Sequence, residues 1–330
     1  MVLAVSVVVA VCPMSIQRTR AQQASDAKVE LRTGLGLLVN ESPDVERGDA
    51  IPWLRRAADR GDVSAKFHLA DFYSSSFEAS GFQDNRKALQ LFLEVAQTGD
   101  PYAAANAGAM FHARWPDRTD LANARKWYEA AAKGGLSNPA WRIAWMFEHG
   151  DGVRRDLEEA YKWLDIADDL APLGTQPQET SAAAQRRDEL ARQMTAVQIR
   201  SAQTRARTWL AARSRSGHCD AQPNQIRTVM TVDDRWMTTL RPWLQNLERQ
   251  LIARLRVPPC SHIESRGLLT VRVLRNGEAS HPVAHPTAGL YYFDAAVEAA
   301  LREIRPEPLP SAFPNSSVEV RVASFYNETP

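Results

Sequence analysis

Two cysteines and the histidines beside them are the side chains of this sequence with the clearest chemistry. Cys219 follows His218, and Cys260 precedes His262 by two positions. In an oxidising compartment the two thiols would form a disulfide, and closing the separation of 41 positions would contribute about 4 kcal/mol. Kept reduced, the four side chains could instead bind zinc, although zinc sites usually contain close CxxC or HxxxH pairs. The sequence favours the disulfide, with the zinc site as the alternative.

The remaining histidines and the known catalytic patterns provide no site. His281 and His285 could form a metal-binding or acid–base pair, but no carboxylate or cysteine lies close in sequence to complete it. His68, His112 and His149 lie in or beside predicted helices and are interpreted as packing or surface residues. The sequence contains no GxSxG, HExxH or phosphate-binding glycine loop. We therefore predict no catalytic residue, no cofactor and no metal ion, with a catalytic site built from distant residues as an alternative.

The N-terminal segment has the pattern of an export signal. An apolar run covers residues 2–11. Ten residues are too few to span a bilayer, which takes about 20, but they suit the apolar region of a secretory signal. Cleavage would follow Ala21 or Ala24, so we expect residues 1–24 to be removed. Because no Lys or Arg precedes the apolar run, the natural start could lie upstream.

The composition is that of a folded soluble protein. Of 330 residues, 44% are hydrophobic and 24% charged, and the length leaves room for about two domains. A net charge of +1 gives no bulk attraction to nucleic acid. Residues 181–260 depart from this balance with 14 Arg, no Lys and 6 acidic residues. This excess could attract an anionic surface or an acidic partner, but we interpret it as a solvated helix face and linker.

Five columns of residues recur with a period of 36 to 38 positions. The first column places a large apolar residue at Trp53, Leu91, Trp127 and Trp163. In register with it are glycines (Gly61, Gly99, Gly135), small residues (Ala70, Gly108, Ala144), aromatics (Tyr73, Phe111, Phe147) and acids (Glu46, Asp84, Asp120, Asp156). Such a period indicates stacked helical hairpins. The glycines would end the first helix of each pair, and the acids would complement the positive end of its dipole.

The best copy of this pattern resembles the Sel-1-like repeat, a relative of tetratricopeptide repeats. The matching residues are Trp127, Tyr128, Ala131, Ala132, Gly135, Gly152, Val153 and Asp156. The resemblance implies an all-α solenoid that binds partner proteins and is not an enzyme. We predict this array over residues 28–172, with an orphan second helix at residues 31–38. Terminal helices would follow at 179–213, with Leu190, Met194, Val197 and Ile199 as their apolar positions and Thr195 as a helix cap.

The pattern changes after a polar linker at residues 214–235. Apolar residues first recur at intervals of three and four, which predicts a helix containing Leu240, Trp243, Leu244, Leu247, Leu251, Ile252 and Leu255. A strand around residues 269–274 then leads to Asn276-Gly277, which predicts a hairpin turn. The return strand carries Pro282 and would lie at an edge. A second helix at 293–304 and a last strand complete an α-β-β-α-β domain with an antiparallel sheet over residues 236–328.

These segments resemble the C-terminal domain of the TonB and TolA energy-transduction family. The matching stretches are residues 243–259, 267–277, 293–301 and 305–310. The resemblance implies a periplasmic location and a sheet edge that adds a strand from a partner through backbone hydrogen bonds. By position, Val318, Val320 and Val322 of the last strand would form this accepting edge.

Together these patterns predict a multidomain protein that is exported to the periplasm and acts there as a non-enzymatic adaptor. Its partners would be proteins or peptides of the cell envelope, bound by the solenoid and by the TonB-like domain, with no nucleic acid and no membrane span in this chain. One alternative is a component of TonB-dependent transport whose membrane anchor lies upstream. A second is an envelope hydrolase with a dispersed site.

Overall fold

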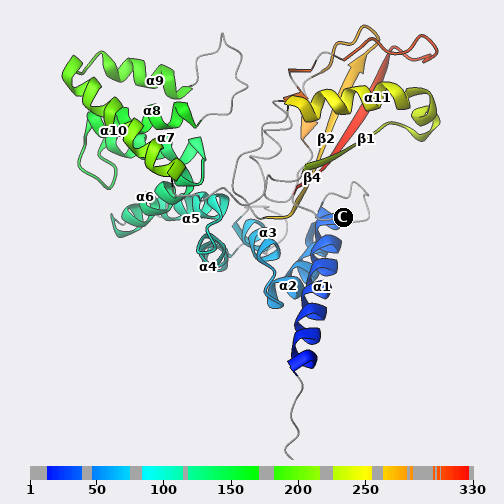
Figure 1. Cartoon of the computed structure of the whole chain (residues 1–330), viewed down its shortest axis with the longest axis horizontal. Coiled ribbons are helices and arrows are strands. Elements are labelled where there is room, and N and C mark those ends of the chain that lie inside the picture. The colour runs from blue at the N-terminus through cyan, green and yellow to red at the C-terminus, as the bar shows by residue number, and fades with distance from the viewer. Residues whose placement is uncertain are drawn as a thin grey trace, which may run out of the picture.

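A computed structural model describes residues 13–38, 47–74, 84–113, 118–170, 182–215, 226–254, 263–280, 283–284 and 300–326 except 302 and 305. Helices form the N-terminal part, and a sheet with one long helix forms the C-terminal part (Figure 1). The helices are α1 (Pro13–Leu38), α2 (Ile51–Asp59), α3 (Val63–Ser74), α4 (Asn85–Ala96), α5 (Pro101–Ala113), α6 (Arg118–Lys133), α7 (Ser137–His149), α8 (Leu157–Asp169), α9 (Ala182–Ala191), α10 (Ala196–Arg215) and α11 (Asp234–Arg254), with a 3-10 turn at Arg47–Ala50. The strands are β1 (Ile226–Thr231), β2 (Ser265–Leu274), β3 (Val283–Ala284) and β4 (Ser317–Tyr326).

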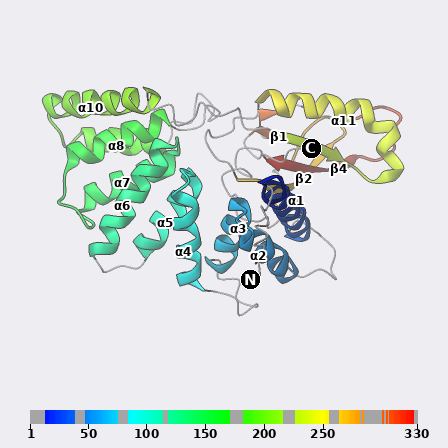
Figure 2. The ribbon, with the colours of Figure 1, turned by 60° about the horizontal axis from the view of Figure 1, so that its bottom comes forward.

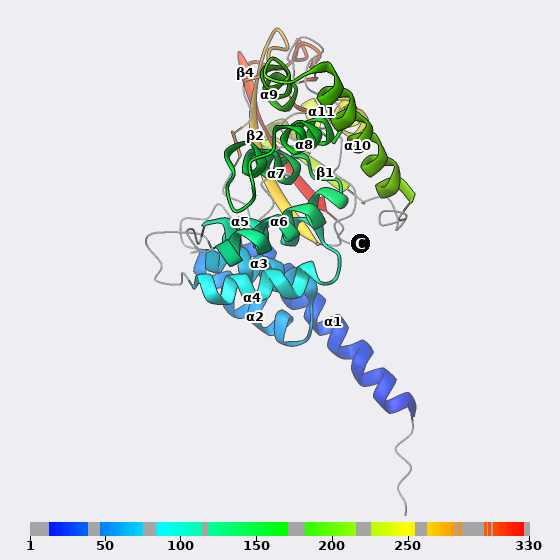
Figure 3. The same cartoon turned by 90° about the vertical axis from the view of Figure 1, so that its left-hand side faces the viewer.

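The helices from α2 to α8 stack as successive hairpins, as the period predicts (Figures 2 and 3). Gly61, Gly99 and Gly135 each lie between the two helices of a hairpin, with φ angles of +89°, +96° and +100°. Glycine adopts this left-handed conformation without the steric cost that a Cβ brings. The predicted column of small residues is buried as well, with Ala70 at 0% and Ala144 at 1% exposure. The glycine column therefore predicts the turns correctly, and the column of small residues predicts where the helices contact each other.

The predicted orphan helix at residues 31–38 is the C-terminal part of α1. Leu31 and Leu35 are fully buried, and a Cβ at Gly34 would come within 2.9 Å of Leu54 in α2. The N-terminal part of α1 projects away from the array (Figures 1 and 3). This one helix crosses both predicted cleavage positions. Residues 2–11 lie outside the described part of the chain, so the export signal stays a prediction.

Acids begin the first helix of several hairpins, and their carboxylates accept backbone hydrogen bonds. Asp84 accepts from the N–H of Lys87 at 3.0 Å, and Asp156 from the N–H groups of Glu158 and Glu159 at 2.9 and 3.0 Å. Asp120 lies in the first turn of α6, while Glu46 lies outside the described residues. Each such bond satisfies a backbone N–H that has no partner within the helix.

The cap at Asp84 gives a testable dependence on pH. The backbone N–H of Lys87, and then the Lys87 ammonium, hold the pKa of Asp84 below its ordinary value of 3.8. A carboxyl with a depressed pKa in the folded state stabilises fully above its unfolded pKa and loses this contribution as the pH falls through the folded pKa. Asp84→Asn keeps an acceptor oxygen but cannot titrate. Urea unfolding between about pH 5 and pH 3 should therefore show the wild-type chain losing stability relative to Asp84→Asn. A constant difference across that range would contradict this assignment.

Two further helices cover the end of the array after α8. Thr195 caps α10 as predicted, because its Oγ1 accepts from the N–H of Gln198 at 3.3 Å and Gln198 Oε1 accepts from the N–H of Thr195 at 2.8 Å. Leu190 is 1% exposed, and the Trp209 ring meets the Trp163 ring of α8 edge-on at 5.3 Å. Val197, predicted as an apolar packing position, is instead 68% exposed. The prediction was wrong there because residues one position off the buried stripe of a helix face solvent.

The C-terminal sheet is antiparallel with the strand order β1-β4-β2-β3. Helix α11 buries an apolar stripe consisting of Leu240, Trp243, Leu244, Leu247 and Leu251, while Ile252 is 54% exposed. The Asn276-Gly277 turn forms as predicted, with Gly277 N–H bonded to Leu274 O at 2.9 Å. The return strand β3 is two residues long and lies at the edge of the sheet. Of the predicted second helix, residues 300, 301 and 303 are described and helical.

Two predictions for this domain are wrong. Strand β1 lies within the predicted linker at residues 214–235, and it adds a strand before α11. Strand β4 lies inside the sheet and pairs with β1 on one side and β2 on the other, so Val318, Val320 and Val322 are not at an edge. The prediction that these three residues belong to a last strand is confirmed, and they are 6%, 0% and 0% exposed. Alternation reports which face is buried and carries no information on whether one or both sides of a strand are paired.

Candidate functional site

A row of partly exposed aromatic side chains runs along α7. Trp141, Trp145 and His149 recur at every fourth position, and Arg142 stands beside them. The Trp145 and His149 rings are stacked with their centroids 4.5 Å apart. The centroid of the His112 ring, at the end of α5, lies 5.9 Å from that of Trp145. We call these five residues the α7 aromatic patch. It crosses two consecutive hairpins of the array, because α5 and α7 belong to neighbouring repeats.

The loop after α7 holds the patch in place. His112 Nε2 donates to Asp151 Oδ2 at 3.0 Å, and the Tyr128 hydroxyl donates to His112 Nδ1 at 3.4 Å. Asp151 stands between Gly150 and Gly152, whose φ angles of +75° and +69° turn the loop back towards α5. Tyr128 is 4% exposed, so its hydroxyl is not presented to solvent. This chain of hydrogen bonds orients the His112 ring and supports a binding surface.

The arginine-rich stretch binds the terminal helices to the array. Arg187 pairs with Asp165 at 3.1 Å and with Asp168 at 2.9 Å, both in α8. Arg186 pairs with Glu148 and Glu189, and these hydrogen bonds raise its pKa. Arg205 of α10 pairs with Glu158 at 3.3 Å and with Glu159. These three arginines neutralise acids of α7, α8 and α9, and Arg200 and Arg207 of α10 remain exposed.

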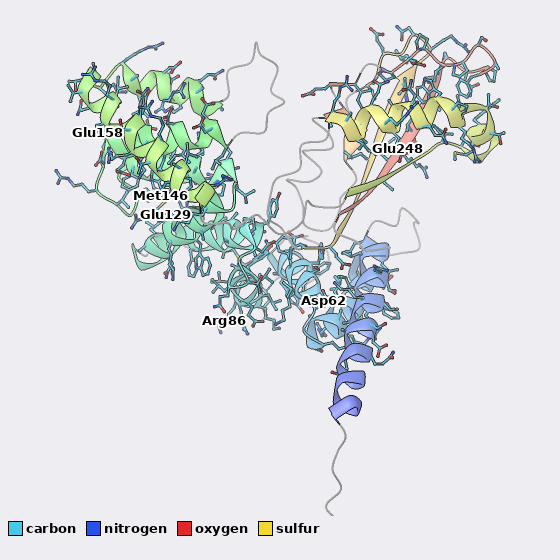
Figure 4. The ribbon with its side chains drawn as sticks, in the orientation of Figure 1. Asp62, Arg86, Glu129, Met146, Glu158 and Glu248 are labelled. Atoms are coloured by element: carbon cyan, nitrogen blue, oxygen red, sulfur yellow. The ribbon has the colours of Figure 1, made fainter. Side chains whose placement is uncertain are left out.

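A polar cluster joins α1 and the α2–α3 hairpin to the C-terminal domain. It consists of Lys28, Asp62, Ser64, His68 and Glu264, which we call the α1–α3 polar cluster. Asp62, labelled in Figure 4, lies where α2 turns into α3 and beside α1. Its Oδ2 atom is 3.1 Å from Lys28 Nζ, and Lys28 Nζ donates to Glu264 Oε1 at 2.6 Å. Burial lowers the pKa of Lys28, but the two carboxylates outweigh burial and raise it.

Sequence reasoning missed this cluster. The expected packing role of His68 is confirmed by its 1% exposure, but the hydrogen bond to the backbone of Glu264, 196 positions away, was not predicted. No local pattern encodes a contact of that separation. The α7 aromatic patch was also missed, although the spacing of Trp141, Trp145 and His149 could have indicated it.

The predicted disulfide and the predicted histidine pairs lie outside the described residues. This applies to Cys219, Cys260, His218, His262 and His281, and also to His285. They stay predictions. Within the described ranges, no group of three or more His, Cys, Asp or Glu side chains could hold a metal ion.

Among the described residues, no helix combines the length and the apolar character needed to cross a bilayer.

The array matches the family model of the Sel1 repeat four times. The matched residues are 33–62, 63–100, 101–136 and 140–167. The chain thus carries Sel1 repeats, which typically mediate protein–protein interaction. Because the match ends at residue 167, the resemblance of the C-terminal domain to the TonB family stays a prediction.

Curated relatives include two regulators of polysaccharide synthesis. An exopolysaccharide production negative regulator of Rhizobium leguminosarum bv. viciae is 26% identical over 136 residues, which is 37% of this chain and 50% of the relative. A chitin synthase regulator of Saccharomyces cerevisiae is 29% identical over 114 residues, 34% of this chain and 16% of the relative. The chain therefore spans half or less of the length of these relatives.

Two solved structures of proteins with the same kind of repeat are similar to part of this chain, with low TM-scores. A Sel1 repeat protein of Oxalobacter formigenes is 24% identical, covers 47% of this chain and 43% of its own, and has a TM-score of 0.36. A protective antigen of uropathogenic Escherichia coli with an SLR fold is 21% identical, covers 62% of this chain and 50% of its own, and has a TM-score of 0.33.

Proposed function

We propose that this chain, with its four Sel1 repeats, is a non-enzymatic adaptor of the bacterial cell envelope that binds a partner protein. The observation that carries the proposal is the α7 aromatic patch, where two Trp rings and an Arg are partly exposed on a Sel1 array. Trp, Tyr and Arg are the residues most enriched among the few that dominate binding energy at protein interfaces. The names of the relatives, a negative regulator and a synthase regulator, support a regulatory adaptor.

Export to the periplasm is part of the same proposal. The apolar run at residues 2–11 supports an export signal, and the resemblance of the C-terminal domain to the TonB family supports a periplasmic location. This domain would bind a second partner. Recovery of the chain from the cytoplasmic fraction of its host, with its N-terminal residues retained, would overturn the proposed export.

The α7 aromatic patch gives the test of the adaptor function. Trp145→Ala should weaken partner binding by about 30-fold, because a central Trp at an interface is worth about 2 kcal/mol or more. The whole chain serves as bait in periplasmic extracts, captured proteins are identified by mass spectrometry, and the dissociation constant is then measured with the purified partner.

Trp53→Ala is the matched control for this experiment. Trp53 is also partly exposed, but it lies on α2 at the far end of the array, with the Arg56 guanidinium 4.2 Å from its ring. Circular dichroism should show that both variants are folded. Equal capture by the wild-type chain and Trp145→Ala, or an equal loss in both variants, would rule out the patch as the binding surface.

A further inference from the structure

Two side chains of α3 form hydrogen bonds with the backbone of Glu264 in the C-terminal domain. The Glu264 N–H donates to Ser64 Oγ at 2.9 Å, and His68 Nε2 donates to Glu264 O at 2.7 Å. Both array side chains belong to α3, and they are 3% and 1% exposed. Two side chains of the array thus satisfy both backbone polar groups of one residue from a different domain. Backbone hydrogen bonds of this kind supply affinity in peptide recognition without depending on sequence.

The side chains of the same segment provide sequence selectivity. Ile263 is fully buried and belongs to the hydrophobic cluster that contains Phe67 of α3 and Leu269 of β2. The Glu264 carboxylate meets the Lys28 ammonium at 2.6 Å, and the Glu264 side chain is 7% exposed. Apolar surroundings at Ile263 and an ammonium beside Glu264 therefore suit an apolar residue followed by an acidic one. A neutral or basic residue in the second place would remove one of the two carboxylates that Lys28 contacts and leave Asp62, 3.1 Å from its ammonium, as the other.

We infer that the α1–α3 polar cluster is a peptide-recognition site for an apolar–acidic dipeptide, and that Ile263–Glu264 occupies this site in cis. The occupied site fixes the C-terminal domain on α1 and α3. A partner protein that presents the same dipeptide competes with Ile263–Glu264 and releases the domain from the array. This recognition holds whether or not the α7 aromatic patch binds a partner.

Two features of the site favour exchange of its occupant. Lys28 is 44% exposed, so the ammonium that selects the acid is reachable from solvent. Glu264 Oε2 is buried and has no hydrogen-bond partner among the described residues. A buried carboxylate with one oxygen unsatisfied is held less tightly than one with both oxygens bonded. A competing peptide can therefore displace Ile263–Glu264 from the site.

The test uses the full-length chain and a labelled peptide of residues 263–268 (IESRGL), acetylated at its N-terminus. A control peptide carries Gln in place of Glu. In the Glu264→Lys chain the cis occupant is disabled, while Lys28, Ser64 and His68 are unchanged. Fluorescence anisotropy should show that this variant binds the peptide at least about tenfold more tightly than the wild-type chain, whose site is filled. The control peptide should bind the variant about tenfold more weakly, the value of one charge-assisted hydrogen bond at a partly exposed site.

A second substitution separates recognition from a merely structural effect. Adding Lys28→Met to Glu264→Lys should abolish the preference for the acidic peptide, so that both peptides bind equally. If Glu264→Lys does not fold, as judged by circular dichroism, Glu264→Gln replaces it, because this change keeps the shape of the side chain and removes its charge. Equal affinity of the folded variant for the two peptides, or no gain over the wild-type chain, would overturn the inference.

Discussion

Gly152→Ala is expected to lower the free energy of unfolding by about 3 kcal/mol. Gly152 has a φ angle of +69°, in the left-handed region where a Cβ costs about 1–2 kcal/mol. The added Cβ would also come within 2.5 Å of the Leu121 Cβ, and Leu121 is fully buried in α6. Because that contact is with the rigid base of the leucine side chain, the helix or the loop must shift, which adds about 1–3 kcal/mol.

Gly99→Ala is the matched control for this prediction. Gly99 also has a positive φ angle, of +96°, but a Cβ there would meet nothing within 4 Å. Its expected cost is about 1–2 kcal/mol, from backbone strain alone. Chemical denaturation of both variants, monitored by circular dichroism, measures the difference. Equal losses at the two positions would show that the loop after α7 yields freely and does not hold Asp151 against His112.

Trp163→Ala is expected to cost about 3–5 kcal/mol and to loosen α9 and α10 first. Trp163 is 3% exposed and lies in the cluster that joins α8 to the terminal helices. Its removal leaves a cavity and also deletes the edge-on contact with Trp209 at 5.3 Å. Because each element of a solenoid packs only against its neighbours, the loss should be local before it is global.

Hydrogen exchange of the backbone amides is the measurement that separates the two stages. Amides of α9 and α10 should lose protection in Trp163→Ala while those of α2 and α3 keep theirs. A double-mutant cycle with Trp209→Ala should give a coupling energy of about 1 kcal/mol for the ring pair. Uniform loss of protection across all the helices would mean that the array unfolds as one unit.

The array could be predicted from sequence because its contacts are local and repeated. Gly61, Gly99 and Gly135 mark the turns directly, since a positive φ angle selects glycine. Asn276-Gly277 likewise encodes its own turn. In each case one or two residues carry the information, and no knowledge of distant parts of the chain is needed.

The sheet order and the joining of the two parts could not be predicted in the same way. Strand β4 is central because β1, from before α11, pairs with it, and residues 226–231 show only a weak alternation. Ser64, His68 and Glu264 come together because the C-terminal domain packs on α3, and each of them is ordinary in its local sequence. The α7 aromatic patch could be predicted only in part. The four-residue spacing is visible in the sequence, but the exposure of the rings depends on tertiary packing.

Further elements of the chain cover both ends of the stack of hairpins from α2 to α8. Helix α1 and the segment at Ile263–Glu264 cover the first hairpin, while α9 and α10 cover the last, held there by Arg187 and Arg205. Further hairpins from a second molecule would have to displace these contacts before they could continue the stack. Among the described residues, both ends of the stack are therefore already in contact with other elements of the same chain.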